Sequence, residues 1–371
     1  MAKEPEIVEV DCSKLNVRAL RTRREAMAVG AGGLAAFLLA ACGGGSGSST
    51  SGATGGGTAA ATATTGGAVG EGKTIALSLN GFNVYDQCLA TGVLEALAGT
   101  QYKFIGAQAN FDSPTEIKNI QNLVAKQPDG LLIQPNTMAS ANRGALEASR
   151  AGIPVLNLLY SGPDEPQDSY VAATQVDGVK GGKMIADYLG QTVKQGKILV
   201  VVGVPGQGFS EDITKGLKQG LGAYPDLQIA AMQPGLFTAG PAQKAVQTML
   251  TAHPDAKVIV DYAAEMGNGI AAFLKARNIT GIHHVTSDGN PEMVPILKAG
   301  RYIQADRYYS SAQQGLMGTK ILRDYMETGK KPDQFVTQVP QAMVTSDTIV
   351  AKVADEPLIY RGYESQVKAV A

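Results

Sequence analysis

Aromatic, carboxylate and amide side chains recur directly after the short apolar runs of this chain. Aromatic rings can cover the C–H faces of a sugar, and carboxylates and amides can bond its hydroxyl groups. Any one of these residues is also an ordinary turn or capping residue, but their repetition points to a ligand site. The residues are Phe82, Asn83, Tyr85, Asp86, Asn157, Tyr160, Glu211, Phe237, Asp261, Tyr262, Asp288 and Arg307.

The apolar runs and the amphipathic segments between them define the elements that must position these residues. Apolar residues at spacings of three and four, as in Leu89, Val93 and Leu97, predict helices between the strands. This alternation predicts an α/β fold with parallel sheets and crossover helices on both faces. In such sheets the ligand crevice lies beyond the carboxyl ends of the strands. The predicted strands are 74–79, 102–107, 130–134, 154–159, 170–173, 198–203, 228–232, 258–261, 284–287 and 302–305.

A different kind of chemistry is indicated near the amino terminus. The run Leu39-Ala40-Ala41-Cys42 ends a short apolar segment that follows several arginines, and it resembles a bacterial lipoprotein signal. We therefore predict that residues 1–41 are a signal peptide and that Cys42 is lipidated. The Arg23-Arg24 pair also fits a twin-arginine signal, and general secretion is the alternative. The apolar segment is too short for a spanning helix, which needs about 20 residues.

Residues 42–72 consist almost entirely of Gly, Ser, Thr and Ala. Such a segment buries too little apolar surface to offset its ordering entropy, so we predict a flexible tether. About 300 residues follow it, more than one core usually spans, which predicts two lobes. Beyond the predicted cleavage point only Cys42 and Cys88 remain, so no intramolecular disulfide is expected.

Several function classes lack support in this sequence. The formal net charge is −1, without basic runs, which gives no reason to expect a nucleic-acid partner. There is no phosphate-binding loop, no Gly-x-Ser-x-Gly elbow and no zinc-like cluster around the three histidines. We therefore expect no enzymatic activity, cofactor or metal, although paired carboxylates brought together in space are invisible at this level.

Six stretches resemble the periplasmic sugar-binding proteins of the ribose- and galactose-binding type, in the correct order: 129–136, 151–155, 181–189, 250–256, 287–291 and 297–300. The resemblance covers residues 73 to about 349. It implies two doubly wound lobes, 73–175 plus 309–338 and 176–306 plus 342–371. The chain would cross between them near 174–177, 305–308 and 338–344. It also implies closure around a small ligand and delivery to an ATP-driven permease.

Binding positions carry over from this family in part. Asp288 matches a carboxylate that precedes Gly-x-Pro, and Phe237 matches an aromatic residue that stacks on the sugar. Phe82, Asn83, Tyr85 and Asp86 would lie in the first cleft loop, and Asn157 on the fourth strand.

Other positions depart from the family pattern. The chain has Leu159-Tyr160 where ribose binders carry Asp-Arg, Glu211 in place of an arginine, and Arg307 in place of the hinge glutamine. The family's asparagine before Glu-Met falls near Ala263, which leaves Asp261 and Tyr262 as nearby polar groups. Loss of the bidentate arginine donors argues against ribose. Another sugar, a polyol, or a ligand with cationic character facing Glu211 and Asp261 would fit better.

Together these features predict a monomeric, exported, lipid-anchored solute-binding protein of an ABC importer, located in the periplasm or on the outer face of the cytoplasmic membrane. Two alternatives stay open: a tethered enzyme on the same fold, and a sensor that presents its loaded form to a signalling receptor.

Overall fold

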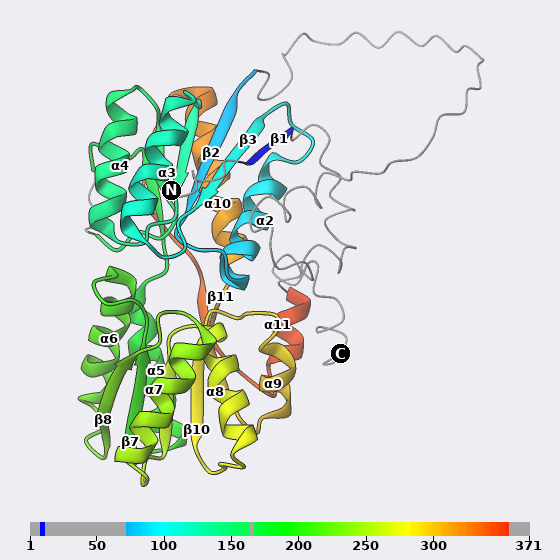
Figure 1. Cartoon of the computed structure of the whole chain (residues 1–371). Coiled ribbons are helices and arrows are strands. Elements are labelled where there is room, and N and C mark those ends of the chain that lie inside the picture. Colours follow the sequence, from blue (N-terminus) through cyan, green and yellow to red (C-terminus); the bar gives the residue numbers. More distant parts are fainter. Residues whose placement is uncertain (1–7, 12–71, 163–166, 356–371) are drawn as a thin grey trace, which may run out of the picture.

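The computed structural model describes residues 8–11, 72–162 and 167–355. Cys42, the predicted tether up to residue 71 and all of the predicted signal peptide except Val8–Asp11 lie outside the described residues. The described chain forms two lobes, one above the other in Figure 1, each with a sheet covered by helices on both faces.

The N-lobe is built on a seven-stranded sheet of order β1-β3-β2-β4-β5-β6-β12. Helices α2 and α10 pack together over one face, and α3 and α4 over the other. Its strands are β1 (Val8–Asp11), β2 (Thr74–Leu79), β3 (Lys103–Gln108), β4 (Gly130–Ile133), β5 (Val155–Asn157), β6 (Ala172–Gln175) and β12 (Val336–Gln338). Its helices are α2 (Val84–Leu97), α3 (Ser113–Ala125), α4 (Met138–Arg150) and α10 (Ser311–Thr328).

The C-lobe is built on a six-stranded sheet of order β13-β11-β10-β9-β7-β8. Helices α5 and α6 pair on one face, and α7 and α8 on the other. Its strands are β7 (Gly196–Val202), β8 (Leu227–Pro234), β9 (Val258–Asp261), β10 (His283–Ser287), β11 (Ala305–Tyr309) and β13 (Gln341–Thr345). Its helices are α5 (Gly178–Thr192), α6 (Gly208–Leu221), α7 (Ala239–Ala252), α8 (Ala264–Ala276), α9 (Val294–Ala299) and α11 (Ile349–Asp355).

The five central strands of each sheet follow the same order. When the five strands of a lobe are numbered along the chain, they lie across the sheet in the order 2-1-3-4-5. In the N-lobe this order is β3-β2-β4-β5-β6, and in the C-lobe it is β8-β7-β9-β10-β11. These strands pair in parallel, and the inner ones are largely buried because helices cover both faces, whereas the edge strand β8 is only partly buried. The predicted fold class, two doubly wound α/β lobes, is confirmed.

The edges of the sheets differ from the all-parallel prediction. Strand β1 pairs antiparallel with β3, and β13 pairs antiparallel with β11, so both sheets are mixed. Strand β1 falls in the segment that the sequence assigns to the signal peptide.

The last strands also differ from the predicted ones. The strand predicted at 302–305 is wrong in position, because β11 runs over Ala305–Tyr309. Its central Asp306 and Arg307 resemble loop residues in the sequence, but both are fully buried. The short strands β12 and β13 were not predicted.

Three connections join the lobes: between β6 and α5, between β11 and α10, and between β12 and β13. The lobes also touch directly, since the backbone N–H of Tyr85 donates to Oε1 of Glu265 across the junction at 3.1 Å. Residues at the facing ends of the two sheets are therefore held at contact distance.

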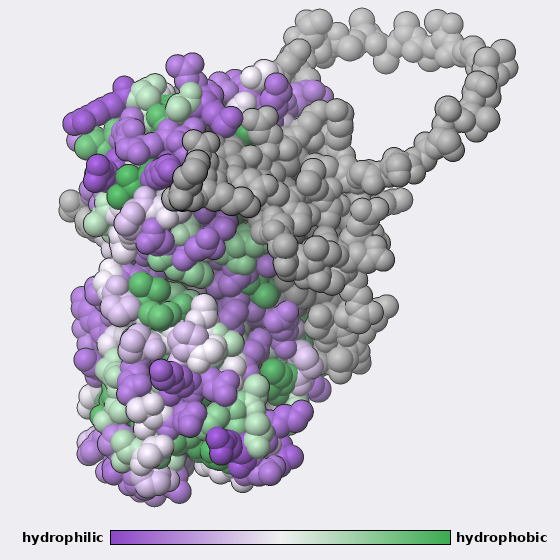
Figure 2. Space-filling view, in the orientation of Figure 1, coloured by the Kyte–Doolittle hydropathy of each residue, from purple (hydrophilic) through white to green (hydrophobic). Residues whose placement is uncertain are grey.

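The described surface seen in Figure 2 is mostly hydrophilic, with small separate groups of apolar residues. Leu146 and Leu236 are the large hydrophobic side chains most exposed among the described residues, at 43% and 40%. Among the helices of the described residues, none is both long enough and apolar enough to cross a membrane.

Candidate functional site

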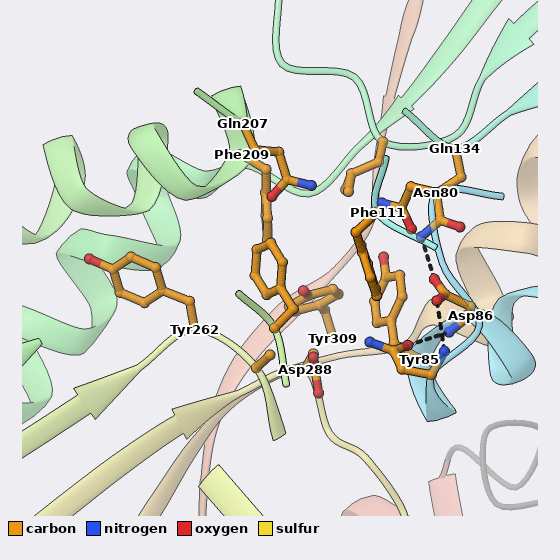
Figure 3. Close-up of a pocket in the computed structure, with 14 residues that line it drawn as sticks. Asn80, Tyr85, Asp86, Phe111, Gln134, Gln207, Phe209, Tyr262, Asp288 and Tyr309 are labelled. Carbon is orange, nitrogen blue, oxygen red and sulfur yellow. Dashed lines mark hydrogen bonds between the residues drawn. The ribbon is translucent and has the colours of Figure 1, made fainter. Parts of the chain in front are cut away.

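A cleft lies between the two lobes, at the carboxyl ends of both sets of strands (Figure 3). This is the position at which doubly wound sheets bind ligands. The N-lobe lines it with Asn80, Asn83, Tyr85, Asp86, Phe111, Gln134 and Leu159. The C-lobe lines it with Gln207, Phe209, Phe237, Tyr262, Ala263, Asp288 and Tyr309.

The first N-lobe loop is ordered by the start of α2. Asn83 caps this helix by accepting from the N–H of Asp86 at 3.1 Å, and the Asp86 carboxylate accepts from the N–H of Asn83 at 2.9 Å. The second oxygen of Asp86 accepts from Nε2 of Gln134 at 2.8 Å. Burial raises the pKa of Asp86 to about 6, and these hydrogen bonds oppose the rise. The carboxylate therefore fixes the loops after β2 and β4 relative to each other.

A group of stacked side chains links the cleft to the hinge strand β11. The ring of Tyr309 packs edge-to-face against Tyr85 and Phe209, with centroids 6.0 Å apart in both pairs. The guanidinium carbon of Arg307 lies 4.8 Å from the centroid of Tyr309 and 5.4 Å from that of Phe209. The hydroxyl of Tyr85 donates to Oε1 of Gln314 at 2.6 Å. Arg307 therefore supports two cleft rings without lining the cleft itself.

Asp288 supplies a carboxylate on the C-lobe side. Its backbone has φ 77°, and Oδ1 accepts from the N–H of Ala264 at 3.1 Å. Burial raises the pKa of the Asp288 carboxyl well above its ordinary value, and the nearby Glu265 and Asp306 raise it further. A ligand hydroxyl that donated to this carboxylate would replace solvation that burial has removed.

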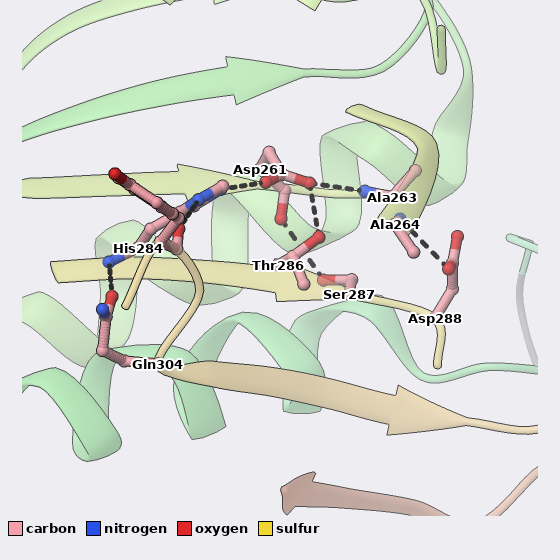
Figure 4. A network of polar contacts seen from close by, with 9 residues as sticks. Asp261, Ala263, Ala264, His284, Thr286, Ser287, Asp288 and Gln304 are labelled. Atoms are coloured by element: carbon pink, nitrogen blue, oxygen red, sulfur yellow. Dashed lines mark hydrogen bonds and ion pairs between the residues drawn. The ribbon is translucent and has the colours of Figure 1, made fainter. Parts of the chain in front are cut away.

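The loops that carry Asp288 and Tyr262 are anchored by the buried network shown in Figure 4. The Asp261 carboxylate contacts Nε2 of His284 at 2.6 Å, and it accepts from Oγ1 of Thr286 at 2.8 Å and from the N–H of Ala263 at 3.1 Å. Both Asp261 and His284 are fully buried. The other ring nitrogen of His284 lies 2.8 Å from the carbonyl oxygen of Tyr302, so the ring is held at both ends.

Six of the twelve predicted site residues line the cleft: Asn83, Tyr85, Asp86, Phe237, Tyr262 and Asp288. Three others are N-lobe residues with different surroundings. Phe82 packs against the main hydrophobic core. Asn157 is fully buried and accepts from the N–H of Leu159, so it orders a cleft residue. Tyr160 packs edge-to-face on Tyr170 and Phe335 inside the lobe.

The remaining three are charged residues that also lie outside the cleft. Glu211 is an exposed residue of α6 that borders a separate surface groove. Asp261 is occupied by the His284 network, and Arg307 lies behind the rings. Neither Glu211 nor Asp261 lines the cleft, so the sequence argument for a cationic ligand that rested on them does not hold.

Eight lining residues were not among the predicted site residues. Asn80, Gln207, Phe209 and Tyr309 follow or end apolar runs, which is the same signal that found the others. Gln134 directly follows β4, and Phe111 follows β3 after two further residues. Leu159 and Ala263 are apolar and carry no such signal.

The buried side-chain polar atoms of the cleft that lack a hydrogen-bond partner in the protein are all acceptors. Asn80, Gln134 and Gln207 are each at most 4% exposed, and one amide oxygen of each has no hydrogen-bond partner within the protein. No lysine, arginine or histidine is among the lining residues. In the part of the chain that the structure describes, no cluster of acidic, histidine and cysteine side chains could hold a metal ion.

Comparison with known families identifies the protein class. Residues 75–331 match the model of the family described as periplasmic binding protein domain. The chain belongs to this family. The resemblance to type I periplasmic sugar-binding proteins found in the sequence is thereby confirmed.

Curated relatives and solved structures agree with this assignment. The ribose import binding protein of Salmonella typhimurium is 26% identical over 230 residues, which are 62% of this chain and 76% of that protein. That of Bacillus subtilis is 25% identical over 268 residues, 71% of this chain and 85% of the relative. A galactofuranose-binding protein superposes with a TM-score of 0.73 at 19% identity, covering 78% of this chain and all of the other. At this identity the structural match supports the fold alone.

Proposed function

We propose that this protein is the solute-binding component of an ABC importer and captures an uncharged sugar or polyol in the cleft between its lobes. The observation that carries the proposal is the set of buried amide oxygens of Asn80, Gln134 and Gln207, which line the cleft without a protein donor. Buried acceptors of this kind cost free energy unless they are paired. The hydroxyl groups of a polyhydroxylated ligand would donate to them.

The other lining groups fit the same ligand class. Six aromatic rings offer apolar surface for C–H groups, and Asp288 accepts further hydroxyl donors. A sugar phosphate or sugar acid would meet no cationic side chain among the lining residues and would face Asp288 and Asp86. Anionic solutes are therefore disfavoured, because no lining side chain would neutralise their charge.

Transport and attachment complete the proposal. Because the ligand would contact both lobes, it would stabilise their closed arrangement, and a permease could distinguish the loaded protein by that shape. The relatives named as ribose import binding proteins support a role in uptake, and the relative named as a xylitol-binding protein supports a polyol as a candidate ligand class. Export through the predicted signal and a lipid on Cys42 would hold the protein beside its permease.

Ligand titration of the full chain tests this proposal. The protein is titrated with sugars, cyclitols, polyols and sugar acids by isothermal calorimetry. The same ligands are screened by thermal shift, because a ligand that binds the folded chain raises its unfolding midpoint by mass action. We expect saturable binding of an uncharged member and none of the acids. Asp288→Ala should weaken that binding at least tenfold, about 1.4 kcal/mol, whereas Asp333→Ala on the exposed surface should not. A panel without any binder would refute the proposal.

A further inference from the structure

The two lobes place a phenylalanine at the same point of their folds. Phe111 follows β3 and Phe237 follows β8, and these strands occupy the same place in the 2-1-3-4-5 order of their sheets. Each phenylalanine immediately precedes the N-cap residue of the next helix, Asp112 for α3 and Thr238 for α7. Phe237 was recognisable from the sequence by family resemblance, and Phe111 was not.

The backbone geometry around the two rings is also the same. Asn110 and Phe111 have φ of 49° and 61°, and Leu236 and Phe237 have φ of 56° and 54°. The N–H of Asp112 donates to the carbonyl of Ala109 at 2.9 Å, and in the C-lobe the N–H of Thr238 donates to that of Gly235 at 3.1 Å. In both lobes, two successive residues with left-handed backbone are followed by the same turn hydrogen bond. The two loops therefore share one backbone conformation.

Each ring lies over a glycine that follows the neighbouring strand of its sheet. A Cβ atom added to Gly81 would lie 2.2 Å from the ring tip of Phe111, and one added to Gly203 would lie 2.0 Å from that of Phe237. A left-handed backbone is unfavourable for phenylalanine, so both lobes keep a strained residue that a glycine would relieve. Strain of this kind persists mainly where it serves a site.

Both rings line the same cleft from opposite lobes. Figure 3 shows Phe111 at the N-lobe wall, next to Asn80 and across the cleft from Phe209. Phe111 is partly exposed, and the backbone of its loop is fixed by the Phe111 N–H donating to the carbonyl of Asn80 at 2.6 Å and by Nδ2 of Asn136 donating to the carbonyl of Phe111 at 3.0 Å. The ring is therefore presented to the cleft on a rigid support.

We propose that Phe111 is a ligand-contacting residue that determines specificity, and that Phe111 and Phe237 together select a cyclic sugar or cyclitol over an acyclic polyol. This inference rests on the proposed function of the cleft. Two rings on fixed backbones offer flat apolar surfaces in set positions. A ring-shaped ligand presents C–H faces in a matching fixed geometry, whereas an acyclic polyol must lose several torsional freedoms to do so.

Calorimetric titration of the full chain with matched pairs of ligands tests the proposal. The probes are D-arabinose and D-arabinitol, D-allose and allitol, and myo-inositol. We expect the unmodified protein to prefer the cyclic member at least tenfold. Phe111→Leu and Phe237→Leu should each lower that preference at least fivefold, and Phe111→Tyr, which keeps the ring, should retain it.

Matched controls separate the ring from the loop. Asn110→Gly and Leu236→Gly relieve the strain of the preceding residues, whose side chains do not line the cleft, and should leave affinities within twofold. The proposal is overturned if Phe111→Leu folds, by circular dichroism, and keeps the cyclic preference, or if the unmodified protein prefers the acyclic members. Failure of the unmodified protein to bind any uncharged probe would instead refute the proposed function, and this inference with it.

Discussion

Asp306 on the hinge strand provides the most direct test of the buried charges beside the cleft. Its side chain is fully buried, and this burial raises the pKa of the carboxyl from 3.8 to about 7. The Gly289 amide and the Arg307 guanidinium oppose the rise, and Asp261 adds to it. Asp306→Asn keeps the size of the side chain and removes its ionisation, so it should stabilise the protein at neutral pH.

The sign and size follow from the two pKa values. Below about pH 4 the carboxyl is protonated in both the folded and the unfolded chain, and its ionisation costs nothing. As the pH rises toward 7, the unfolded chain releases the proton and the folded chain retains it, so the free energy of unfolding falls. The full penalty, reached above pH 7, is about 4 kcal/mol at roughly 1.4 kcal/mol per pH unit. The part that develops between pH 5 and pH 8 is about 3 kcal/mol.

Equilibrium urea unfolding of the ligand-free full chain, followed by circular dichroism from pH 5 to pH 8, measures this difference. The gain in stability of Asp306→Asn over the unmodified protein should grow with pH across that range. Asp333→Asn, a change at an exposed position, should show no such trend. A difference that stayed constant with pH, or a variant less stable at pH 8, would refute the assignment of a buried proton to Asp306.

Two further predictions concern the C-lobe core and the amino-terminal signal. Asp261→Asn should lower the free energy of unfolding by about 1–3 kcal/mol in urea, because it weakens the buried hydrogen bonds to His284, Thr286 and the N–H of Ala263; an unchanged or higher stability would contradict this. Cys42→Ser should move the protein from the membrane pellet to the supernatant after ultracentrifugation and abolish palmitate labelling; persistence of both in the variant would show that Cys42 is not the lipid attachment site.

Local patterns were sufficient to predict the central elements of the fold. The strand predicted at 258–261 is β9 as observed, and the spacing of Leu89, Val93 and Leu97 lies within α2. These elements bury continuous apolar runs or one apolar face, so their periodicity is visible in the sequence. Strand β11 was misplaced because Asp306 and Arg307 are polar residues inside a buried strand. Its environment is supplied by neighbours distant in sequence, such as Ser287 and Gln341.

For the candidate site, too, the sequence predicted some of the lining residues correctly and misjudged others. Asp288 and Phe237 were found because they stand at strand ends in motifs that can be read locally. Glu211 was misjudged because the first turn of α6 directs Phe209 into the cleft and leaves Glu211, two residues later, exposed at the surface. Position along a helix turn, and not distance along the chain, decides which side chain enters a cleft.

The sequence by itself determined the family, the two-lobed α/β class and the strand ends at which a ligand would be met. These properties depend on periodicity and on short motifs, which are local in the chain. Only the tertiary structure decided which groups share the cleft: that Arg307 supports rings from behind, that Asp261 is occupied by His284, and that Phe111 repeats Phe237 in the other lobe. Such relations join segments separated by tens to hundreds of residues, and they exist only once both sheets have packed and brought their carboxyl ends together.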